Sequence, residues 1–240
     1  MTRGDLWPTN HGAAVRIVRA AQYASLLGAE VYIVTDDRDR YWRYRQGRRE
    51  ALRYGPRFRA MQEWPGFGAA GRLAERICAR VGYPPEETFL YRPQFDPQWW
   101  ARVGYVGLRH DIEVFQAEFP GYGLACWLAA QALEARCSIV QHNVEWDRLQ
   151  DVMGLSSQET QRIRELELFA LQRVDEVIAV STEDRDRMVE AGVEAARVTV
   201  LPHGVDTCSY TPGRGRLLRW SRGHDEGPLL FFHGTLHYWP

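Results

Sequence analysis

The sequence predicts an α/β fold with a doubly wound parallel sheet, because short apolar runs alternate with helical segments along the chain. Residues 177–180 (VIAV) have the length and composition of a buried parallel strand. Ser181 with Asp184 three residues later is the pattern of a helix N-cap followed by a first-turn carboxylate, and Gly192 ends that helix. Residues 198–201 form a second apolar run, which a proline stops. Strand, capped helix and strand make a βαβ unit, from which parallel sheets are built.

The N-terminal segment is predicted to contain a loop, a helix and a strand. Residues 1–10 show no strand pattern, so we expect a loop that follows a strand absent from the sequence. Gly12 leads into an apolar-faced helix over residues 13–27, which Gly28 ends, and residues 31–34 form a strand. A glycine at a helix N-terminus can present backbone N–H groups to an anion, or it can simply permit a tight turn. Both interpretations of this glycine stay open.

The segment over residues 36–59 is the most basic part of the chain. Its arginines alternate with aromatic residues, and they are Arg38, Arg40, Arg43, Arg45, Arg48, Arg49, Arg53, Arg57 and Arg59. Three interpretations compete: a solvated helix face, a contact with anionic lipid headgroups or a lipid-diphosphate ligand, and nucleic-acid binding through stacking aromatics. The near-neutral rest of the chain disfavours nucleic acid as a partner. Peripheral contact with an anionic membrane is our working hypothesis.

Residues 60–110 carry no chemistry that we can name. We expect a helix over residues 69–81 ended by Gly82, a connector rich in proline and aromatics over residues 84–97, and helical structure over residues 98–109. Core packing is the commoner fate of aromatic side chains, so three of them are expected in the core rather than in a ligand pocket. They are Trp99, Trp100 and Tyr105.

The following segment predicts two strands with polar residues at their carboxyl ends. Residues 112–115 (IEVF) form the first strand, and residues 138–141 (SIVQ) form the second. The second strand runs directly into His142 and Asn143, with Glu145 close behind. Ligands of parallel sheets bind at the carboxyl ends of the strands. We therefore expect this histidine to face a ligand, although a lone histidine is more often structural.

A capping box then leads back to the βαβ unit described first. Ser156 and Glu159 have the spacing of that box, so a helix begins there. At the carboxyl ends of the last two strands lie Ser181, His203 and Gly204. These three residues are further candidates for a binding site.

Composition is that of an ordinary globular protein of 240 residues, with 45% hydrophobic and 25% charged residues. Thirty basic residues stand against thirty-one acidic ones, which gives a net charge of −1 and does not point to a polyanionic partner. Four scattered cysteines without a C-x-x-C pair predict reduced thiols rather than a zinc site. No apolar run approaches the roughly 20 residues of a membrane span, and residues 2–12 do not form a signal peptide.

Two runs, VDEVIAVSTEDRDRMVEAGV and RVTVLPHGVD, resemble the end of the N-terminal domain of glycosyltransferase family 4. The family pattern is an acidic helix, an apolar strand ending in serine and then P-N/H-G-V-D, and His203 is the histidine variant. The resemblance implies a GT-B architecture of two Rossmann-like domains. It also implies retaining transfer of a sugar, of hexosyltransferase type, from a nucleotide sugar to a hydroxyl acceptor in polysaccharide or glycoconjugate biosynthesis. No metal and no cofactor beyond the nucleotide-sugar substrate are implied.

Roles for individual residues follow from the same resemblance. His142 matches the histidine that faces the transferred sugar and is the catalytic candidate. Gly12 and Ala13 occupy the loop that faces the donor diphosphate and the acceptor, where the family usually carries two glycines. Asn143 and Glu145 meet the acceptor hydroxyl or orient their neighbours.

The remaining matches concern the donor side and the metal question. Gly234 falls in the loop that touches the donor phosphates, in a run (LFFHGTL) that resembles the opening of the second domain. Asp184 and Asp186 form a D-x-D pair, but they lie in a capped helix whose first turn favours carboxylates. No metal site is expected from them.

The resemblance divides the chain into three parts. We expect an N-terminal acceptor-side domain over residues 1–212, a linker over residues 213–228 and the start of a donor-binding domain over residues 229–240. On this view the chain is truncated at both ends and inactive alone. Expected partners are a nucleotide sugar and a glycan or lipid-linked acceptor, and the expected location is the cytoplasm or the inner face of the membrane.

Two other classes of function stay open. One is a non-catalytic Rossmann-like binding module, or the acceptor subunit of a glycosyltransferase split over two chains. The other is a nucleotide-sugar epimerase of similar architecture, which the HGVD end followed by a proline- and glycine-rich stretch fits less well. Titration with a nucleotide sugar helps to discriminate among these classes.

Overall fold

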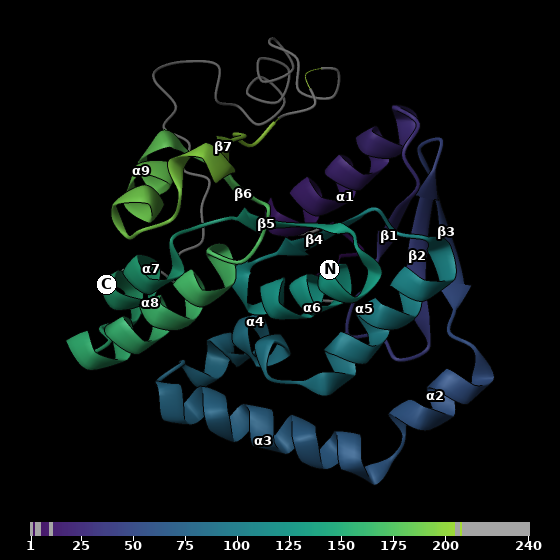
Figure 1. Ribbon diagram of the computed structural model, residues 1–240, viewed down its shortest axis with the longest axis horizontal. Coiled ribbons are helices and arrows are strands. Elements are labelled where there is room, and N and C mark those ends of the chain that lie inside the picture. The colour runs from purple at the N-terminus through teal and green to yellow at the C-terminus, as the bar shows by residue number, and fades with distance from the viewer. Residues whose placement is uncertain (1, 3–5, 10–11, 205–206, 208–240) are drawn as a thin grey trace, which may run out of the picture. The chain divides into compact units, whose positions relative to one another are not determined.

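A computed structural model describes residues 2, 6–9, 12–204 and 207 (Figure 1). The chain divides into two compact units, Met1–Pro202 and His203–Pro240, and the helices and strands of the described residues lie in the first. The centre of that unit is a four-stranded parallel sheet in the order β4-β5-β6-β7. Its strands are β4 (Val114–Glu118), β5 (Arg136–Gln141), β6 (Glu176–Ala179) and β7 (Val198–Val200). The predicted α/β class with a parallel sheet is confirmed.

The predicted βαβ unit is present as β6, α9 (Thr182–Glu190) and β7. The Oγ atom of Ser181 accepts a hydrogen bond from the backbone N–H of Asp184 at 3.0 Å, which satisfies one of the free donors of the first turn. The capping box that starts at Ser156 is also present, and it opens α8 (Ser157–Leu171). Local signals of helix capping therefore identified both helices.

The other helices are α1 (Gly12–Leu26), α2 (Pro56–Gln62), α3 (Pro65–Val81), α4 (Thr88–Tyr91), α5 (Pro97–His110), α6 (Gly123–Leu133) and α7 (Glu145–Met153). Of these helices, α6 links β4 to β5, α7 leads with α8 from β5 to β6, and α1 to α5 precede β4 in the chain. Short 3-10 turns are η1 (Pro85–Glu87), η2 (Arg92–Gln94), η3 (Pro120–Tyr122) and η4 (Ala195–Arg197). The predicted helices of the N-terminal half are confirmed, although α3 begins four residues earlier than expected. The expected connector over residues 84–97 contains η1, α4 and η2 as well.

Most of the basic segment is a β-hairpin, so the interpretation as a solvated helix face is wrong for the hairpin arginines, whereas Arg57 and Arg59 do lie on a helix, α2. Strands β1 (Val31–Ile33), β2 (Arg40–Arg45) and β3 (Arg48–Arg53) form a separate antiparallel sheet. Gln46 and Gly47, which join β2 to β3, both have positive φ values, 50° and 72°. Two consecutive residues with positive φ form the kind of two-residue turn whose backbone twist matches the twist of the flanking strands. Gln-Gly is an uncommon sequence for such a turn, and the hairpin was therefore missed.

Among the residues that the structure describes, two hydrophobic clusters form the interior. The larger contains the parallel sheet, α5, α6 and α8, and the smaller lies between α1 and the antiparallel sheet. Trp99 is buried in the larger cluster, and Trp100 and Tyr105 pack against it, as predicted.

Three cysteines of the described residues are free and buried: Cys78, Cys126 and Cys137. Burial raises the pKa of Cys78 to about 12 and that of Cys126 to about 11. The prediction of buried, reduced thiols is confirmed for these three, and Cys208 lies outside the described residues.

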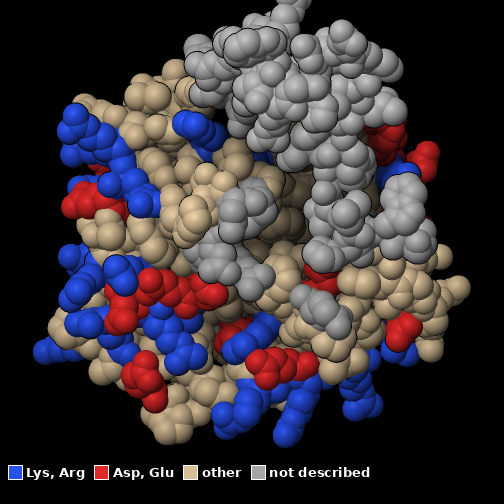
Figure 2. Space-filling model, turned by 180° about the vertical axis from the view of Figure 1, so that it is seen from behind, with Lys and Arg blue, Asp and Glu red and all other residues tan. Residues whose placement is uncertain are grey.

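Charged side chains of both signs are interspersed over the face shown in Figure 2. In the hairpin, several arginines are neutralised locally, for example Arg43 by Glu50 at 2.6 Å across the strands and Arg45 by Glu30 at 3.2 Å. Within the described ranges, no helix combines the length and the hydropathy that a membrane span requires.

Candidate functional site

The carboxyl ends of β4 and β5 bring two polar side chains into direct contact. Glu118 is the last residue of β4, and His142 directly follows the last residue of β5. The Oε2 atom of Glu118 lies 2.9 Å from Nε2 of His142, and both side chains are buried. The two strands are parallel neighbours, so their carboxyl ends share one edge of the sheet. A buried carboxylate–imidazole pair at this edge can hold and move a proton.

Glu118 is an ionised acceptor despite its burial. Burial acts to raise its pKa, but the hydrogen bond and the charge of His142, with a hydrogen bond from Gln116, hold that pKa below its usual value. Gln116 donates to Oε1 of the same carboxylate at 2.6 Å. Because an ionised carboxylate only accepts, Nε2 of the imidazole must carry the proton in this bond. The pair therefore fixes the tautomer of His142.

Two further residues approach the pair. The ring of Phe119 stacks on the imidazole of His142 with ring centroids 4.4 Å apart and planes inclined by 25°. Partial burial lowers the pKa of Arg16, and the charge of Glu118 opposes that shift, which places this α1 guanidinium in the field of the carboxylate. Arg16 also donates to the backbone oxygen of Leu201, just beyond β7, at 3.3 Å. Helix α1 thus reaches the carboxyl edge of the sheet.

Asn143 and Glu145 belong to a second, structural network. Asn143 donates to Oε1 of Glu145 at 3.3 Å, while Oε2 of Glu145 accepts from the Tyr91 hydroxyl at 3.0 Å and from Nε of Arg148 at 2.7 Å. The Glu145 side chain is only 1% exposed. Of the two roles expected for Glu145, these contacts favour orientation of its neighbours over contact with an acceptor.

Glu167 of α8 closes the turn that carries His142. Its carboxylate accepts from the backbone N–H groups of Glu145 and Trp146 at 3.2 Å each, and from the side-chain amide of Gln141. The first two donors are free N–H groups of α7, whose N-cap residue, Val144, has no side-chain acceptor. Glu167 therefore supplies a cap from another helix and fixes the residues on both sides of His142.

Three further predicted residues lie at helix N-termini of the first unit: Gly12 and Ala13 begin α1, and Ser181 caps α9. Gly12 is the exposed first residue of α1, and a Cβ added there would meet nothing within 4 Å, so no close backbone approach requires glycine. Ala13 follows it in the helix and is partly buried. The hydroxyl of Ser181 is engaged in capping α9. The capping bond gives Ser181 a structural role. For Gly12 and Ala13, contact with the donor diphosphate and the acceptor stays a prediction.

Three predicted residues lie in the second compact unit. His203 and Gly204 are exposed and follow directly after the first unit. Gly234 lies outside the described residues.

Sequence reasoning missed Glu118 and Phe119. The predicted strand ended at residue 115, whereas β4 extends to Glu118, so the carboxyl end was misplaced by three residues. A signal was available: Phe115 and Ala117 alternate with Gln116 and Glu118, and this period of two continues until Pro120. Glu167 could not be found from sequence, because its partners are contributed by another helix.

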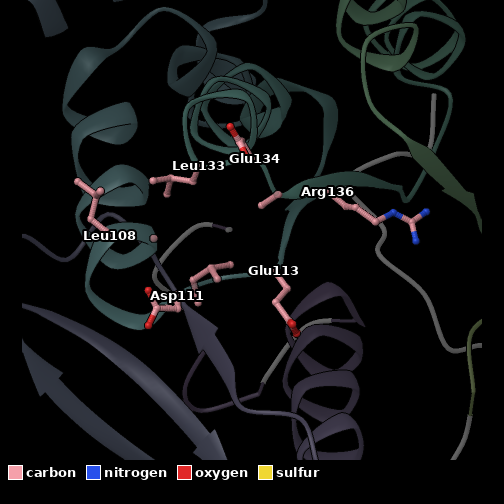
Figure 3. A pocket seen from close by; sticks show the side chains of 9 residues that line it. Leu108, Asp111, Glu113, Leu133, Glu134 and Arg136 are labelled. Atoms are coloured by element: carbon pink, nitrogen blue, oxygen red, sulfur yellow. The ribbon is translucent and has the colours of Figure 1, made fainter.

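The cavity drawn in Figure 3 does not coincide with this pair. The cavity in Figure 3, of about 490 Å³, lies at the amino ends of β4 and β5, at the opposite edge of the sheet. Asp111, Glu113, Glu134 and Arg136 are among the residues that line it, and it shares no residue with the predicted site. We give more weight to the carboxyl edge, because ligands of parallel sheets bind there.

Within the described part of the chain, no three His, Cys, Asp or Glu side chains gather as metal ligands would. Comparison with known proteins then supplies one finding: the model of Glycosyltransferase Family 4 matches residues 10–208. No curated protein matches the chain. The matched range includes both strands of the buried pair and the complete parallel sheet.

Proposed function

The chain belongs to glycosyltransferase family 4, and we propose that it acts in the retaining transfer of a hexosyl group from a nucleotide sugar to a hydroxyl of a glycan or lipid-linked acceptor. The observation that carries this proposal is the buried Glu118–His142 pair at the carboxyl edge of the sheet. A hydrogen-bonding pair of fixed orientation suits a substrate whose recognition depends on hydroxyl groups. Polysaccharide or glycoconjugate biosynthesis is the proposed setting.

His142 is the proposed catalytic residue, and it faces the transferred sugar. Its imidazole is held by Glu118, so it enters the reaction in one orientation and one tautomer. Transfer of a glycosyl group passes through an oxocarbenium-like state, which gains from preorganised polar groups. Gly12 and Ala13 are proposed for the diphosphate and acceptor side, with His203, Gly204 and Gly234 as further substrate contacts.

The first experiment measures nucleotide release from UDP-glucose, UDP-galactose and GDP-mannose, each offered separately to the enzyme with its complete donor-binding domain. We expect one donor to be turned over, and we expect His142→Ala to lower that turnover at least about tenfold while the thermal unfolding curve keeps its midpoint. The anomeric configuration of the product, read by NMR, tests retention. An unchanged turnover in the variant would remove His142 from the site.

A non-catalytic module is the second candidate, and the structural use of Asn143, Glu145 and Ser181 favours it. These three side chains are engaged within the chain rather than presented to a ligand. If no donor is turned over and a lipid-linked glycan still binds, the chain acts as an acceptor-binding module or subunit.

Domain organisation and location remain proposals of their own. We place the acceptor-side domain over residues 1–212, a linker over residues 213–228 and the start of the donor domain over residues 229–240. Limited proteolysis that cleaves outside residues 213–228 first would contradict this division. For location we propose the cytoplasm, with peripheral membrane contact through the hairpin arginines between Arg38 and Arg59.

A further inference from the structure

The backbone of Phe119 adopts a conformation that bulky residues avoid. Its φ is +108° and its ψ is 146°, in a region that is essentially restricted to glycine. Phe119 directly follows Glu118 at the carboxyl end of β4. An outlier of this kind costs free energy and persists only where the surrounding structure enforces it.

Contacts on both sides enforce this conformation. The N–H of Phe119 donates to the backbone oxygen of Val140 at 3.1 Å, which continues the pairing with β5, and its own oxygen accepts from Tyr122 at 3.2 Å. Tyr122 is completely buried. A Cβ added to Gly121 would lie 1.9 Å from the backbone oxygen of Leu90, so this turn packs directly on the backbone of α4. The turn after β4 thus has no room to relax.

The unusual φ has a geometric consequence for His142. In a regular strand, successive side chains point to opposite faces, so Glu118 and Phe119 could not both reach one imidazole. In this structure both do: Oε2 of Glu118 lies 2.9 Å from Nε2, and the ring of Phe119 stacks on the imidazole with ring centroids 4.4 Å apart. The positive φ is what brings two consecutive residues onto the same ring.

We propose that Phe119 and Glu118 act together as positioning residues for His142, one fixing the plane of the imidazole and the other its in-plane rotation and tautomer. The proposal rests on the proposed function of His142 in glycosyl transfer. A group that must be oriented before reaction gains rate from such restraint, because less motion is lost in reaching the transition state. Backbone strain is retained at position 119 because of this task.

The test compares Phe119→Leu with Phe119→Tyr, and Phe169→Leu of α8 serves as the matched control far along the chain. Turnover is measured with UDP-glucose, or with whichever of the three nucleotide sugars gives the fastest nucleotide release. The histidine ring signals of the whole 240-residue protein are recorded by NMR and assigned with His142→Gln. We expect Phe119→Leu to remove the upfield shift that the stacked ring imposes on the His142 signals. We expect its kcat to fall about tenfold with KM within about twofold, while the other two variants stay near wild type.

Each other outcome is decisive. Unchanged ring signals, or shifted ring signals with unchanged turnover, overturn the proposal. If the wild-type enzyme with its complete donor-binding domain releases nucleotide from none of the donors, the proposed function fails by itself. The NMR comparison then still decides the positioning claim, because it needs no substrate: Phe119→Leu and Glu118→Leu must each change the His142 ring signals, and Phe119→Tyr must preserve them.

A second pair of variants separates the strain from the stacking. Phe119→Ala and Phe119→Gly both remove the ring, but only glycine accepts the positive φ without cost. We expect the unfolding equilibrium constant, from urea titration, to be about tenfold smaller for Phe119→Gly than for Phe119→Ala. Equal constants would show that the turn relaxes freely, and that result overturns the enforced geometry on which the proposal depends.

Discussion

At the scale of single residues, two buried glutamates near His142 have pKa values that are shifted in opposite directions. The pKa of Glu118 lies below its usual value because of His142 and Gln116, which outweigh the effect of burial. The pKa of Glu167 lies well above its usual value because of burial and the charge of Glu145. One carboxylate is therefore stabilised by its partners, and the other is favoured in its protonated form.

These shifts predict opposite effects of pH on stability. Because the folded-state pKa of Glu118 is lowered, its contribution is present above the usual value of about 4.5 and is lost as pH falls through the folded pKa. The folded-state pKa of Glu167 is raised. Its contribution to the free energy of unfolding is therefore present below pH 4.5 and is lost as pH rises toward the folded pKa. We expect Glu118→Gln to flatten the acid side of the stability profile and Glu167→Gln to flatten the neutral side. A difference of one in pKa corresponds to about 1.4 kcal/mol.

Urea denaturation over a pH series checks both expectations, with the wild-type protein measured at each pH. Parallel profiles for the wild type and either variant would show that the corresponding carboxylate titrates alike in the folded and unfolded chain. The two variants control for each other, since both replace a buried glutamate by its amide.

Residue-scale prediction from sequence was right where a side chain follows a recognisable strand and failed where its partner is distant. His142 was predicted at a strand end, and it lies at one. Glu118 was not predicted as a site residue because the predicted strand ended three residues before the end of β4. Glu167 lies 25 residues beyond His142 in a helix whose pattern indicates only packing, so no local rule connects the two.

At the scale of elements, local signals predicted the parallel sheet and its helices but not the hairpin. Capping residues and apolar runs act within a few residues, so Ser156 and Ser181 identified their helices directly. In β2 the buried Tyr41 and Tyr44 are three apart, a spacing that suits a helix better than the alternation of a strand. Residues 40–45 form a strand because they pair with β1 and β3. The sequence of one strand does not show which other strands it pairs with.

The hairpin turn offers a direct test of its assignment. Gln46 has φ +50°, so Gln46→Gly is expected to raise the free energy of unfolding by about 1 kcal/mol. Gln161→Gly, in the exposed part of α8, should lower it by about the same amount, because glycine weakens a helix. Gly47→Ala should also lower it, since Gly47 has φ +72°, a conformation that costs alanine free energy. Thermal unfolding measures all three, and a loss of stability in Gln46→Gly would contradict the turn.

At the scale of the whole molecule, charge is distributed so that two surfaces could meet a membrane. On the hairpin, Arg48 and Arg53 are exposed, and Arg49 lies 4.3 Å from the ring of Trp7. On α3, the only acidic residue is Glu75, and it pairs with Arg92 of η2. That leaves three exposed arginines on α3, at positions 72, 76 and 80, one helical turn apart.

These two surfaces provide a matched experiment for the proposed membrane contact. We expect a triple Gln variant at Arg48, Arg49 and Arg53 to lower partition onto vesicles containing phosphatidylglycerol by about tenfold or more, since each lost cation is worth about 1 kcal/mol at an anionic surface. The triple Gln variant of α3 removes the same charge and should bind as the wild type does. Vesicle co-sedimentation measures both, with phosphatidylcholine vesicles as the neutral control. If only the α3 variant loses binding, the hairpin is not the contact surface.

The buried thiols have a consequence for following how this protein opens. Cys78 in α3, Cys126 in α6 and Cys137 in β5 are shielded and of low reactivity, because burial raises the pKa of each. A thiol-modifying reagent added to the native protein therefore modifies each position only when its own element detaches from the core. Mass spectrometry of the modified peptides would give separate opening rates for α3, α6 and β5 in one experiment, without any introduced cysteine.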